Sequence, residues 1–187
     1  CICRAGAGVN HIPIDMATER GVVVFNTPGG NANAVKELVI CGLLLSSRRI
    51  IQGHQFAQTL SSQDADELTH LVETNKKNFK GNELKGKTIG IIGLGAIGSL
   101  LAQSVVSMDM KVIGYDPNIS IDAAWQLPKE VVKADNLKDL LSNSDYISIH
   151  VPLVEETKNL ICNDVIKFIK PGAKLINLSR GSIVNNK

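Results

Sequence analysis

The chain has 187 residues, of which 44% are hydrophobic, and its 20 basic and 18 acidic side chains leave a formal net charge of +2. This length allows one well-formed core and part of a second. Without a basic block we expect neither nucleic acid nor an anionic membrane as a partner. The longest apolar stretches, 38–45 and 89–102, are too short or too interrupted by glycine to cross a bilayer.

The four cysteines, Cys1, Cys3, Cys41 and Cys162, form no C-x-x-C pair. Three of them lie in apolar segments, so we expect buried, reduced thiols and a cytoplasmic protein, and no metal site. The chain begins at Cys1 inside an apolar segment, and it ends shortly after another one. We therefore expect a fragment of a longer protein, in which any secretory signal would lie outside this sequence.

The first 30 residues have a β-turn-α-β pattern. We predict a strand over Cys1–Ala5, a turn at Gly6–Gly8, a helix over Pro13–Glu19 and a buried parallel strand over Val22–Phe25. This stretch is too short to be a domain, so we expect the C-terminal remnant of one. The run Asn26–Gly30 then reads as a hinge.

A long apolar helix is predicted from Asn31 to Ile50. Because it is apolar around much of its circumference, we expect it to be buried between layers or between subunits. The polar stretch Gln52–Glu83 that follows is expected to face solvent, with a helix near Asp64–Asn75.

From residue 88 onward, strands alternate with helical segments. The predicted strands are Thr88–Ile92, Lys111–Tyr115, Tyr146–His150 and Ala173–Leu178, and the predicted helices are Ala96–Met108, Leu137–Leu141 and Cys162–Phe168. Strands separated by helices imply a parallel sheet with right-handed crossovers. We therefore predict a doubly wound α/β domain over residues 31–187, incomplete at its C-terminus.

A glycine-rich turn joins the first of these strands to the following helix. In Gly93-Leu94-Gly95-Ala96-Ile97-Gly98, the first glycine permits a tight turn and the second lets a pyrophosphate approach the backbone. The third lets the helix pack closely on the strand, and the helix N-terminus favours phosphate. A glycine pattern alone is weak, but this strand–turn–helix context predicts a dinucleotide site.

An acid, Asp116, follows the next strand, 18 residues after the last glycine. It can accept hydrogen bonds from both hydroxyls of an adenosine ribose, and it would repel a 2′-phosphate. The motif therefore favours NAD over NADP. The alternative is a glycine-rich turn with a surface aspartate.

Four motifs together resemble the D-isomer-specific 2-hydroxyacid dehydrogenases, and within that family the phosphoglycerate dehydrogenases. They are Arg4-Ala5-Gly6-Ala7-Gly8-Val9-Asn10, Asn26-Thr27-Pro28-Gly29-Gly30-Asn31 with Glu37-Leu38, the glycine turn with Asp116, and Asn177-Leu178-Ser179-Arg180-Gly181. The resemblance covers the whole chain in the right order. It implies a Rossmann NAD-binding domain over residues 31–187, preceded by the tail of a flavodoxin-like substrate domain over residues 1–30.

Arg180 is the catalytic residue that the resemblance implies. It follows a buried strand, at the sheet edge where ligands of doubly wound folds bind, and its guanidinium can hold a carboxylate with two parallel hydrogen bonds. In the family, the corresponding arginine orients a 2-keto acid and polarises its carbonyl. The alternative is a solvated arginine at a strand end.

The resemblance also implies further contacts. The substrate contacts are Arg4, Gly6, Ala7, Asn31 and Arg180, and the cofactor contacts are Gly93, Gly95, Ala96, Ile97, Gly98, Asp116, Val151, Pro152, Leu178, Ser179, Arg180 and Ala7. Because Ala7 stands where relatives often have threonine, its side-chain contact is in doubt. Arg4 fits the position beside the substrate phosphate.

The resemblance implies an NAD-dependent oxidoreductase that interconverts 3-phosphoglycerate and 3-phosphohydroxypyruvate in serine biosynthesis, as a homodimer or higher homo-oligomer. Alternatives are a glyoxylate or hydroxypyruvate reductase of the same family and a non-catalytic, NAD-sensing protein like the family's co-repressors. The family's glutamate and its histidine base follow the arginine, so we expect them beyond Lys187 and expect this stretch alone to be inactive. His150 is expected to be structural.

Overall fold

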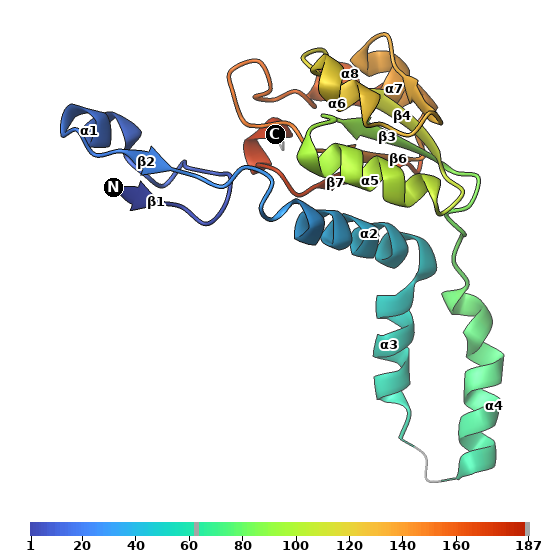
Figure 1. Cartoon of the computed structure of the whole chain (residues 1–187). Helices are drawn as coiled ribbons and strands as arrows, with labels where there is room; N and C mark the ends of the chain where they lie inside the picture. The colour runs from blue at the N-terminus through green and yellow to red at the C-terminus, as the bar shows by residue number, and fades with distance from the viewer. Residues whose placement is uncertain (62–63, 186–187) are drawn as a thin grey trace.

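A five-stranded parallel sheet forms the centre of the protein (Figure 1), seen in a computed structural model that describes residues 1–61 and 64–185. The strands lie in the order β5-β4-β3-β6-β7. Their bounds are β3 Thr88–Ile92, β4 Lys111–Tyr115, β5 Val131–Lys133, β6 Tyr146–Ile149 and β7 Lys174–Asn177. With helices on both faces, this sheet confirms the predicted doubly wound α/β fold.

The order of the strands places a switch point at β3. The chain passes from β3 through β4 to β5 on one side, and then returns to the other side of β3 for β6 and β7. Ile92 is level with Tyr115 and with Ile149, which in turn is level with Asn177. Four strands therefore end in one row, and ligands of doubly wound folds bind beyond such a row at the switch point.

The central strand β3 is apolar on both faces. Ile89 and Ile91 belong to the core on one face, whereas Ile92 belongs to the core on the other. Between them, a side chain at Gly90 would overlap Leu140 of the helix α7, Leu137–Asn143, and Ser144, the residue that follows this helix. Glycine at this position therefore lets α7 approach the sheet closely.

Two helices cover one face of the sheet, α5 (Ala96–Val106) directly and α2 (Ala32–Arg48) beside it (Figure 1). The buried side chains of this face are Val39, Leu43, Ile89, Ile91, Leu101, Val105, Met110 and Val112. Spacings of four residues, as between positions 39 and 43, place apolar side chains on one helix face. These two helices therefore bury the face of the sheet to which the glycine turn leads the chain.

A buried pair of hydroxyls connects α2 to the sheet. Ser47 Oγ donates to the Leu43 carbonyl and lies 2.7 Å from the hydroxyl of Tyr146 on β6. Because the single proton of Ser47 points at Leu43, the Tyr146 hydroxyl is the donor of the second bond. This bond joins residues 99 positions apart.

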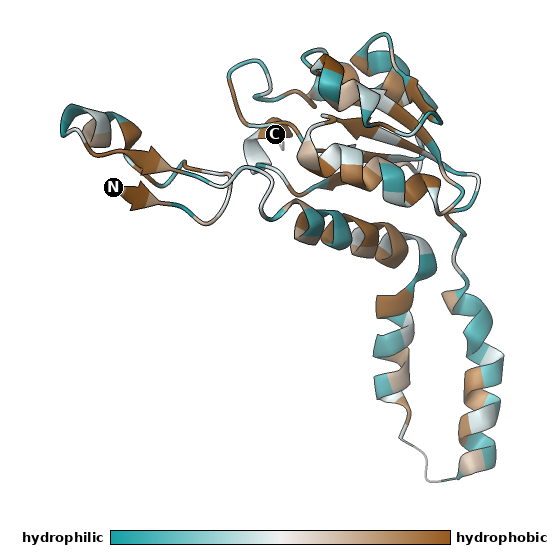
Figure 2. Cartoon of the chain, viewed as in Figure 1, coloured by the Kyte–Doolittle hydropathy of each residue, from teal (hydrophilic) through white to brown (hydrophobic). Residues whose placement is uncertain are grey.

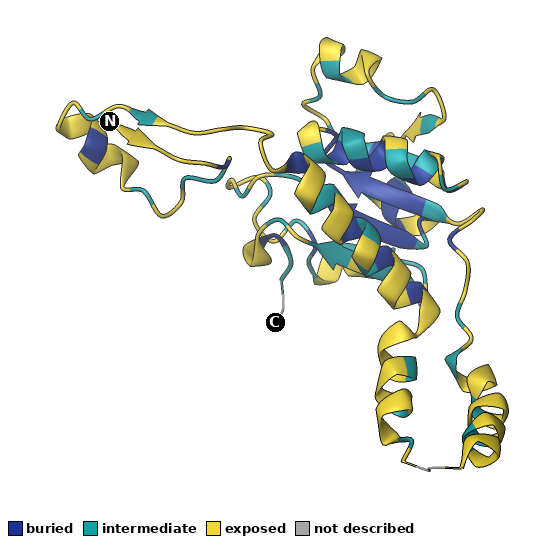
Figure 3. Ribbon diagram, turned by 60° about the horizontal axis from the view of Figure 1, so that its bottom comes forward, coloured by how far each residue is buried: buried dark blue, intermediate teal, exposed yellow. Residues whose placement is uncertain are grey.

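The other face is covered by α7 and by shorter elements. The helix α6 Ile121–Trp125 lies instead on the α5 side, since Gln103 Nε2 of α5 donates to the carbonyl of Gln126, the residue after α6. The shorter elements of the α7 face are α8 Asn163–Ile166 and the 3-10 turn η2 Gly181–Ile183. Its buried core contains Leu140, Leu141, Ile147, Ile149, Ile161 and Ile183. Figure 3 shows the sheet as the most deeply buried part of the chain.

The first 30 residues extend away from this sheet (Figure 1). They form β1 Ile2–Cys3, α1 Ile14–Glu19 and β2 Val24–Phe25, with β1 and β2 paired in parallel. The parallel β-turn-α-β pattern is therefore confirmed. The predicted burial of the second strand is wrong, because no layer of the described residues covers it and Phe25 is 57% exposed.

The cysteines are free thiols, as predicted, but the prediction that three are buried is wrong. Cys1 and Cys3 are exposed beside the uncovered β1. Cys41 is exposed because it lies on α2 opposite the face that carries Val39 and Leu43. Cys162 is half-buried.

An arm of two helices projects from the end of α2 (Figure 1). It contains α3 Ile50–Thr59, α4 Ala65–Asn75 and the 3-10 turn η1 Lys76–Phe79, none of which has a buried residue. The helix near Asp64–Asn75 is confirmed, and the Asp64 carboxylate caps it by accepting from the amide of Asp66. The helix α3 was not predicted; it begins where Arg49 adopts a left-handed φ of 48°.

The long helix α2 is buried on one face only. Figure 2 colours much of α2 as hydrophobic, yet among its apolar residues Leu38 is 56% exposed. Leu44 and Leu45 are exposed as well. The predicted all-round burial between layers is therefore wrong within this chain, and burial against another subunit stays a prediction.

Two short elements were not predicted. The strand β5 has three residues and pairs only with β4, at the edge of the sheet, and α6 has five residues. Neither is long enough to produce a periodic pattern. In the part of the chain that the structure describes, no helix combines the length and the apolar character needed to span a bilayer.

We predict that Tyr146→Phe lowers the free energy of unfolding by about 1 kcal/mol, because it removes a buried hydrogen bond without opening a cavity. Urea unfolding measures the change. Tyr115→Phe is the matched control, since the Tyr115 hydroxyl makes no hydrogen bond to the described residues. Equal effects of the two substitutions would contradict the role given to the Ser47–Tyr146 bond.

Candidate active site

The glycine turn lies at the carboxyl end of β3, where the strand order switches. Gly93 has a φ of +92°, the left-handed conformation that this tight turn requires. A side chain at Gly98 would overlap the carbonyl oxygen of Gly93, so α5 can contact the turn only with glycine there. Gly95 is the N-cap of α5, and apart from its chain neighbours no atom of the described residues lies within 4 Å of where its side chain would stand.

The carboxylate of Asp116 reaches this turn from the end of β4. Oδ2 accepts from the amide of Leu94 at 2.8 Å, and Oδ1 accepts from the amide of Asn118 at 3.0 Å. Sequence analysis missed this contact with the turn. Each oxygen keeps a second lone pair, so the half-buried acid can still accept from ribose hydroxyls.

These features fit a dinucleotide. Open space at Gly95 leaves room for a pyrophosphate, and the N-terminus of the 11-residue helix α5 favours its negative charge. The acid at the end of β4 stands where a ribose would lie. The turn, the helix and the acid therefore suit one extended ligand.

A cleft of about 1370 Å³ lies beside the turn, between the first 16 residues and the sheet. The predicted site residues that line it are Arg4, Gly6, Ala7, Asn31, Ile97, Val151, Pro152, Leu178, Ser179 and Arg180. The other predicted residues, Gly93, Gly95, Ala96, Gly98 and Asp116, do not line it. Of these, Gly93 borders the cleft, since a side chain at Gly93 would lie 3.0 Å from Val151.

The turn that follows β1 is held in place by hydrogen bonds that its carbonyl groups accept. The Thr27 hydroxyl donates to the Arg4 carbonyl, the Thr27 amide donates to the Gly6 carbonyl, and Arg4 Nε donates to the Gly8 carbonyl. The amides of Ala7 and Gly8 have no acceptor among the described residues. Two N–H groups on a fixed turn can therefore bind an anion in the cleft.

Arg180 enters the cleft from the end of β7. Its Nη1 donates to the Ser179 carbonyl at 3.1 Å, and its Nη2 donates to Asn10 Oδ1 at 3.2 Å. The Ser179 hydroxyl donates to the Ile149 carbonyl of β6, which fixes this loop to the sheet. Sequence analysis missed the contact with Asn10, because nothing local links residues 170 positions apart.

His150 follows β6 and lines the same cleft. Its Nε2 lies 2.8 Å from the Ser148 hydroxyl, and its buried Nδ1 has no partner among the described residues. Burial lowers the pKa of His150 to about 4. The ring is therefore neutral near pH 7 and too weak a base to take a hydroxyl proton efficiently.

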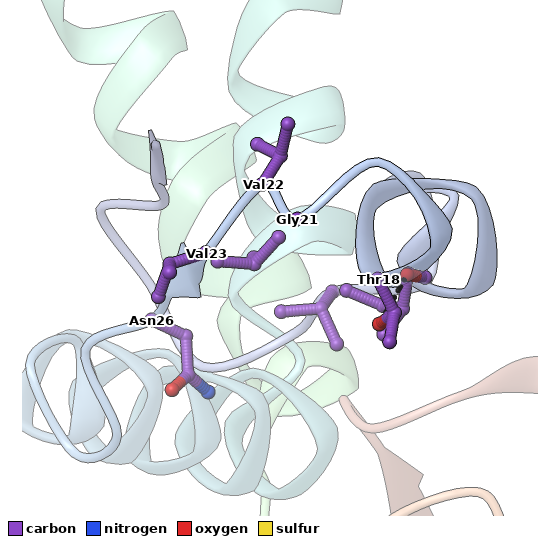
Figure 4. Close-up of a pocket in the computed structure, with 8 residues that line it drawn as sticks. Thr18, Gly21, Val22, Val23 and Asn26 are labelled. Atoms are coloured by element: carbon purple, nitrogen blue, oxygen red, sulfur yellow. Dashed lines mark hydrogen bonds between the residues drawn. The ribbon is translucent and has the colours of Figure 1, made fainter.

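A smaller pocket of about 520 Å³ lies between α1 and β2 (Figure 4). Its walls are largely apolar, with Val22, Val23 and Gly21 on one side. The polar groups of Thr18 and Asn26 already donate to backbone carbonyls. This pocket therefore offers no group for catalysis.

The described residues contain no cluster of three metal-ligating side chains.

The family model described as "D-isomer specific 2-hydroxyacid dehydrogenase, NAD binding domain" matches residues 41–187. The chain belongs to the D-isomer-specific 2-hydroxyacid dehydrogenases. The resemblance found in the sequence is thereby confirmed, and NAD is the cofactor of this domain.

Two curated relatives illustrate the similarity. The D-3-phosphoglycerate dehydrogenase of Mycobacterium tuberculosis is 36% identical over 184 residues, which are 98% of this chain and 32% of that protein. The hydroxypyruvate reductase of Thermotoga maritima is 38% identical over 186 residues, which are 100% of this chain and 55% of the reductase. The chain thus spans about a third of the first relative and about half of the second.

Among solved structures, the D-lactate dehydrogenase of Aquifex aeolicus, complexed with NAD and lactic acid, is similar with a TM-score of 0.78. It is 30% identical, and the match covers 98% of this chain and 51% of the lactate dehydrogenase. This D-lactate dehydrogenase therefore shares the fold of the chain.

We predict that the protein loses stability as the pH falls from about 6.5 to about 4. In that range an unfolded His150, with its ordinary pKa of 6.5, binds a proton that the folded protein does not bind, so acid favours unfolding. The loss from this group approaches about 3 kcal/mol below pH 4. Urea unfolding at about pH 7 and about pH 4.5 measures it.

His150→Gln should remove this part of the pH dependence, whereas His54→Gln, at an exposed position on α3, should preserve it. An unchanged pH dependence in the His150 variant would contradict the assignment.

We predict that Asp116→Ala weakens NAD binding by about tenfold to a hundredfold and narrows the preference for NAD over NADP, because a charged acceptor is lost. Asp116→Asn keeps an oxygen for the Leu94 amide but loses the charge, so it should relax discrimination with less loss of NAD affinity. Calorimetric titration with both cofactors measures this, with Asp122→Ala as the control. Unchanged affinities for both cofactors in Asp116→Ala would show that the acid is misassigned.

Proposed function

We propose that the whole protein transfers hydride between 3-phosphoglycerate and 3-phosphohydroxypyruvate, with NAD as cofactor, in serine biosynthesis. The observation that carries the proposal is the position of Arg180 and of the free amides of Ala7 and Gly8 around one cleft beside the glycine turn. A small carboxylate bound there would lie next to the reactive end of a dinucleotide. The names of the relatives support the same class of substrate.

Arg180 is the proposed catalytic residue. Its guanidinium is suited to a carboxylate held by two hydrogen bonds, and its positive charge would stabilise negative charge that develops on the C2 oxygen. Asn31 supports the substrate site, because its side chain makes no bond that caps α2 and it lines the cleft. Held at the glycine turn and Asp116, NAD would supply the hydride acceptor for oxidation at C2.

The proton of the C2 hydroxyl needs a base. His150 is neutral near pH 7 and has a pKa of about 4, so it is not the proposed base. We assign this role to a histidine paired with a glutamate beyond Lys187, as the family resemblance implies. Residues 1–187 alone are then expected to bind ligands without turnover.

Arg4 supports a phosphorylated substrate. Its side chain lines the cleft, and it braces the turn through Nε, so the other end of its guanidinium is available to an anion. Hydroxypyruvate or glyoxylate reduction is the second candidate, favoured by the 38% identity to the reductase of Thermotoga maritima. The two candidates differ in whether a phosphate is bound.

The proposal also covers the domain organisation, the oligomeric state and the cellular compartment of the whole protein. Residues 1–30 would be the end of a separate substrate domain with its hinge, in keeping with a two-stranded sheet that extends away from the main one. The exposed apolar face of α2 would pack against a second copy in a homodimer or higher oligomer. Four free thiols suit the reducing cytoplasm.

We predict that the whole protein prefers 3-phosphoglycerate to glycerate by about a hundredfold in kcat/KM, because the phosphate gains charged hydrogen bonds. Arg4→Ala should remove most of this preference, because kcat/KM for 3-phosphoglycerate falls much more than kcat/KM for glycerate, which loses only the brace on the Gly8 carbonyl. Steady-state kinetics with both substrates measures it, with Arg20→Ala as the control. Equal use of both substrates by the wild type would favour the reductase instead.

A further inference from the structure

The guanidinium of Arg180 rests on a loop from the other end of the chain. Its Nη2 donates to Asn10 Oδ1 at 3.2 Å across the cleft. This is a side-chain contact between the end of β7 and the loop that follows β1. It therefore links the residue proposed for catalysis to the segment proposed to hold the substrate.

Both sides of this contact are braced. On one side, Asn177 Nδ2 donates to the Arg180 carbonyl at 2.9 Å, and Nη1 of Arg180 donates to the Ser179 carbonyl. On the other side, Arg4 Nε donates to the carbonyl of Gly8, two residues before Asn10. A hydrogen bond between two fixed loops restricts the rotamers of a long side chain, which would otherwise be mobile.

The space for the guanidinium depends on Gly8. A side chain at Gly8 would overlap Nη2 of Arg180. The φ of Gly8 lies outside the left-handed region, so other residues could adopt its backbone conformation. Glycine is thus needed here for room, and not for an unusual backbone.

We propose that Gly8 and Asn10 form a seat that positions Arg180 for a substrate carboxylate. Two of the five guanidinium N–H groups are occupied by Ser179 and Asn10, which leaves three without a partner among the described residues. The two hydrogen bonds fix the orientation of the planar guanidinium, and therefore the directions in which the three remaining N–H groups point. Asn10 is a positioning residue that acts through Arg180, and this inference rests on the proposed role of Arg180.

The test measures the affinity of the NAD-loaded whole protein for hydroxypyruvate by calorimetry. Oxidised NAD prevents turnover of this 2-keto acid, so binding alone is read. Asn10→Ala should weaken the binding of hydroxypyruvate by about fivefold to tenfold, because Arg180 loses the hydrogen bond that orients it. The affinity for NAD should stay within about twofold, since Asn10 does not contact the glycine turn.

Asn10→Gln keeps a neutral amide oxygen that can accept from Nη2 without adding charge, and it should restore part of the affinity, which a role independent of this bond would not predict. Asn82→Ala, at an exposed position whose backbone amide alone is bonded, is the matched control. Hydroxypyruvate affinity equal to the wild type in Asn10→Ala, or equal loss in the Ala and Gln variants, would overturn the seat.

Gly8→Ala provides a second, independent variant. The new methyl group would displace the flexible end of Arg180, so hydroxypyruvate affinity should fall while the free energy of unfolding changes little. In an Arg180→Ala background, Asn10→Ala and Gly8→Ala should have no further effect. An undiminished effect in that background would show that these residues do not act through Arg180.

The two proposals fail differently. If Arg180→Ala leaves hydroxypyruvate binding unchanged, the role of Arg180 in the proposed function is wrong. If Arg180→Ala abolishes binding while Asn10→Ala does nothing, the proposed function stands and only the seat is wrong.

Discussion

The close contact of helix α5 with strand β3 determines where everything else in the site lies. Gly98 touches the carbonyl of Gly93, so the N-terminus of α5 is held beyond the row in which four strands end. No larger side chain fits there without separating helix from strand. Asp116, His150 and Leu178 each follow the last residue of their strand in that row. The parallel register thus brings the strand ends to one edge, and one backbone contact fixes the N-terminus of α5 beside them.

A few polar contacts then fix the loops at this edge. Asp116 holds the glycine turn through the Leu94 amide, and Ser179 ties its loop to β6. Arg180 reaches across to Asn10. Each of these groups belongs to a different loop, so the shape of the cleft is set by bonds between loops on a rigid sheet, and not by any one loop alone.

The sheet and the glycine turn could be predicted because they depend on local patterns. The strands β3, β4, β6 and β7 could be predicted from apolar runs. The turn could be predicted from the spacing of its glycines between a strand and a helix. Exposure could not be predicted, because the apolar strand around Phe25 looks the same whether or not a layer covers it. The contact of Asn10 with Arg180 could not be predicted from the sequence either, since it depends on how two distant segments meet.

The arm formed by α3 and α4 contrasts with this edge. It contains no buried residue, and its two halves meet through Phe56 and Phe79, whose ring centroids are 5.1 Å apart. Elements with so little burial open locally at low free energy. The arm therefore stands outside the cooperative unit that unfolds with the sheet. The order of its helices therefore reports on this local opening rather than on the stability of the nucleotide-binding core.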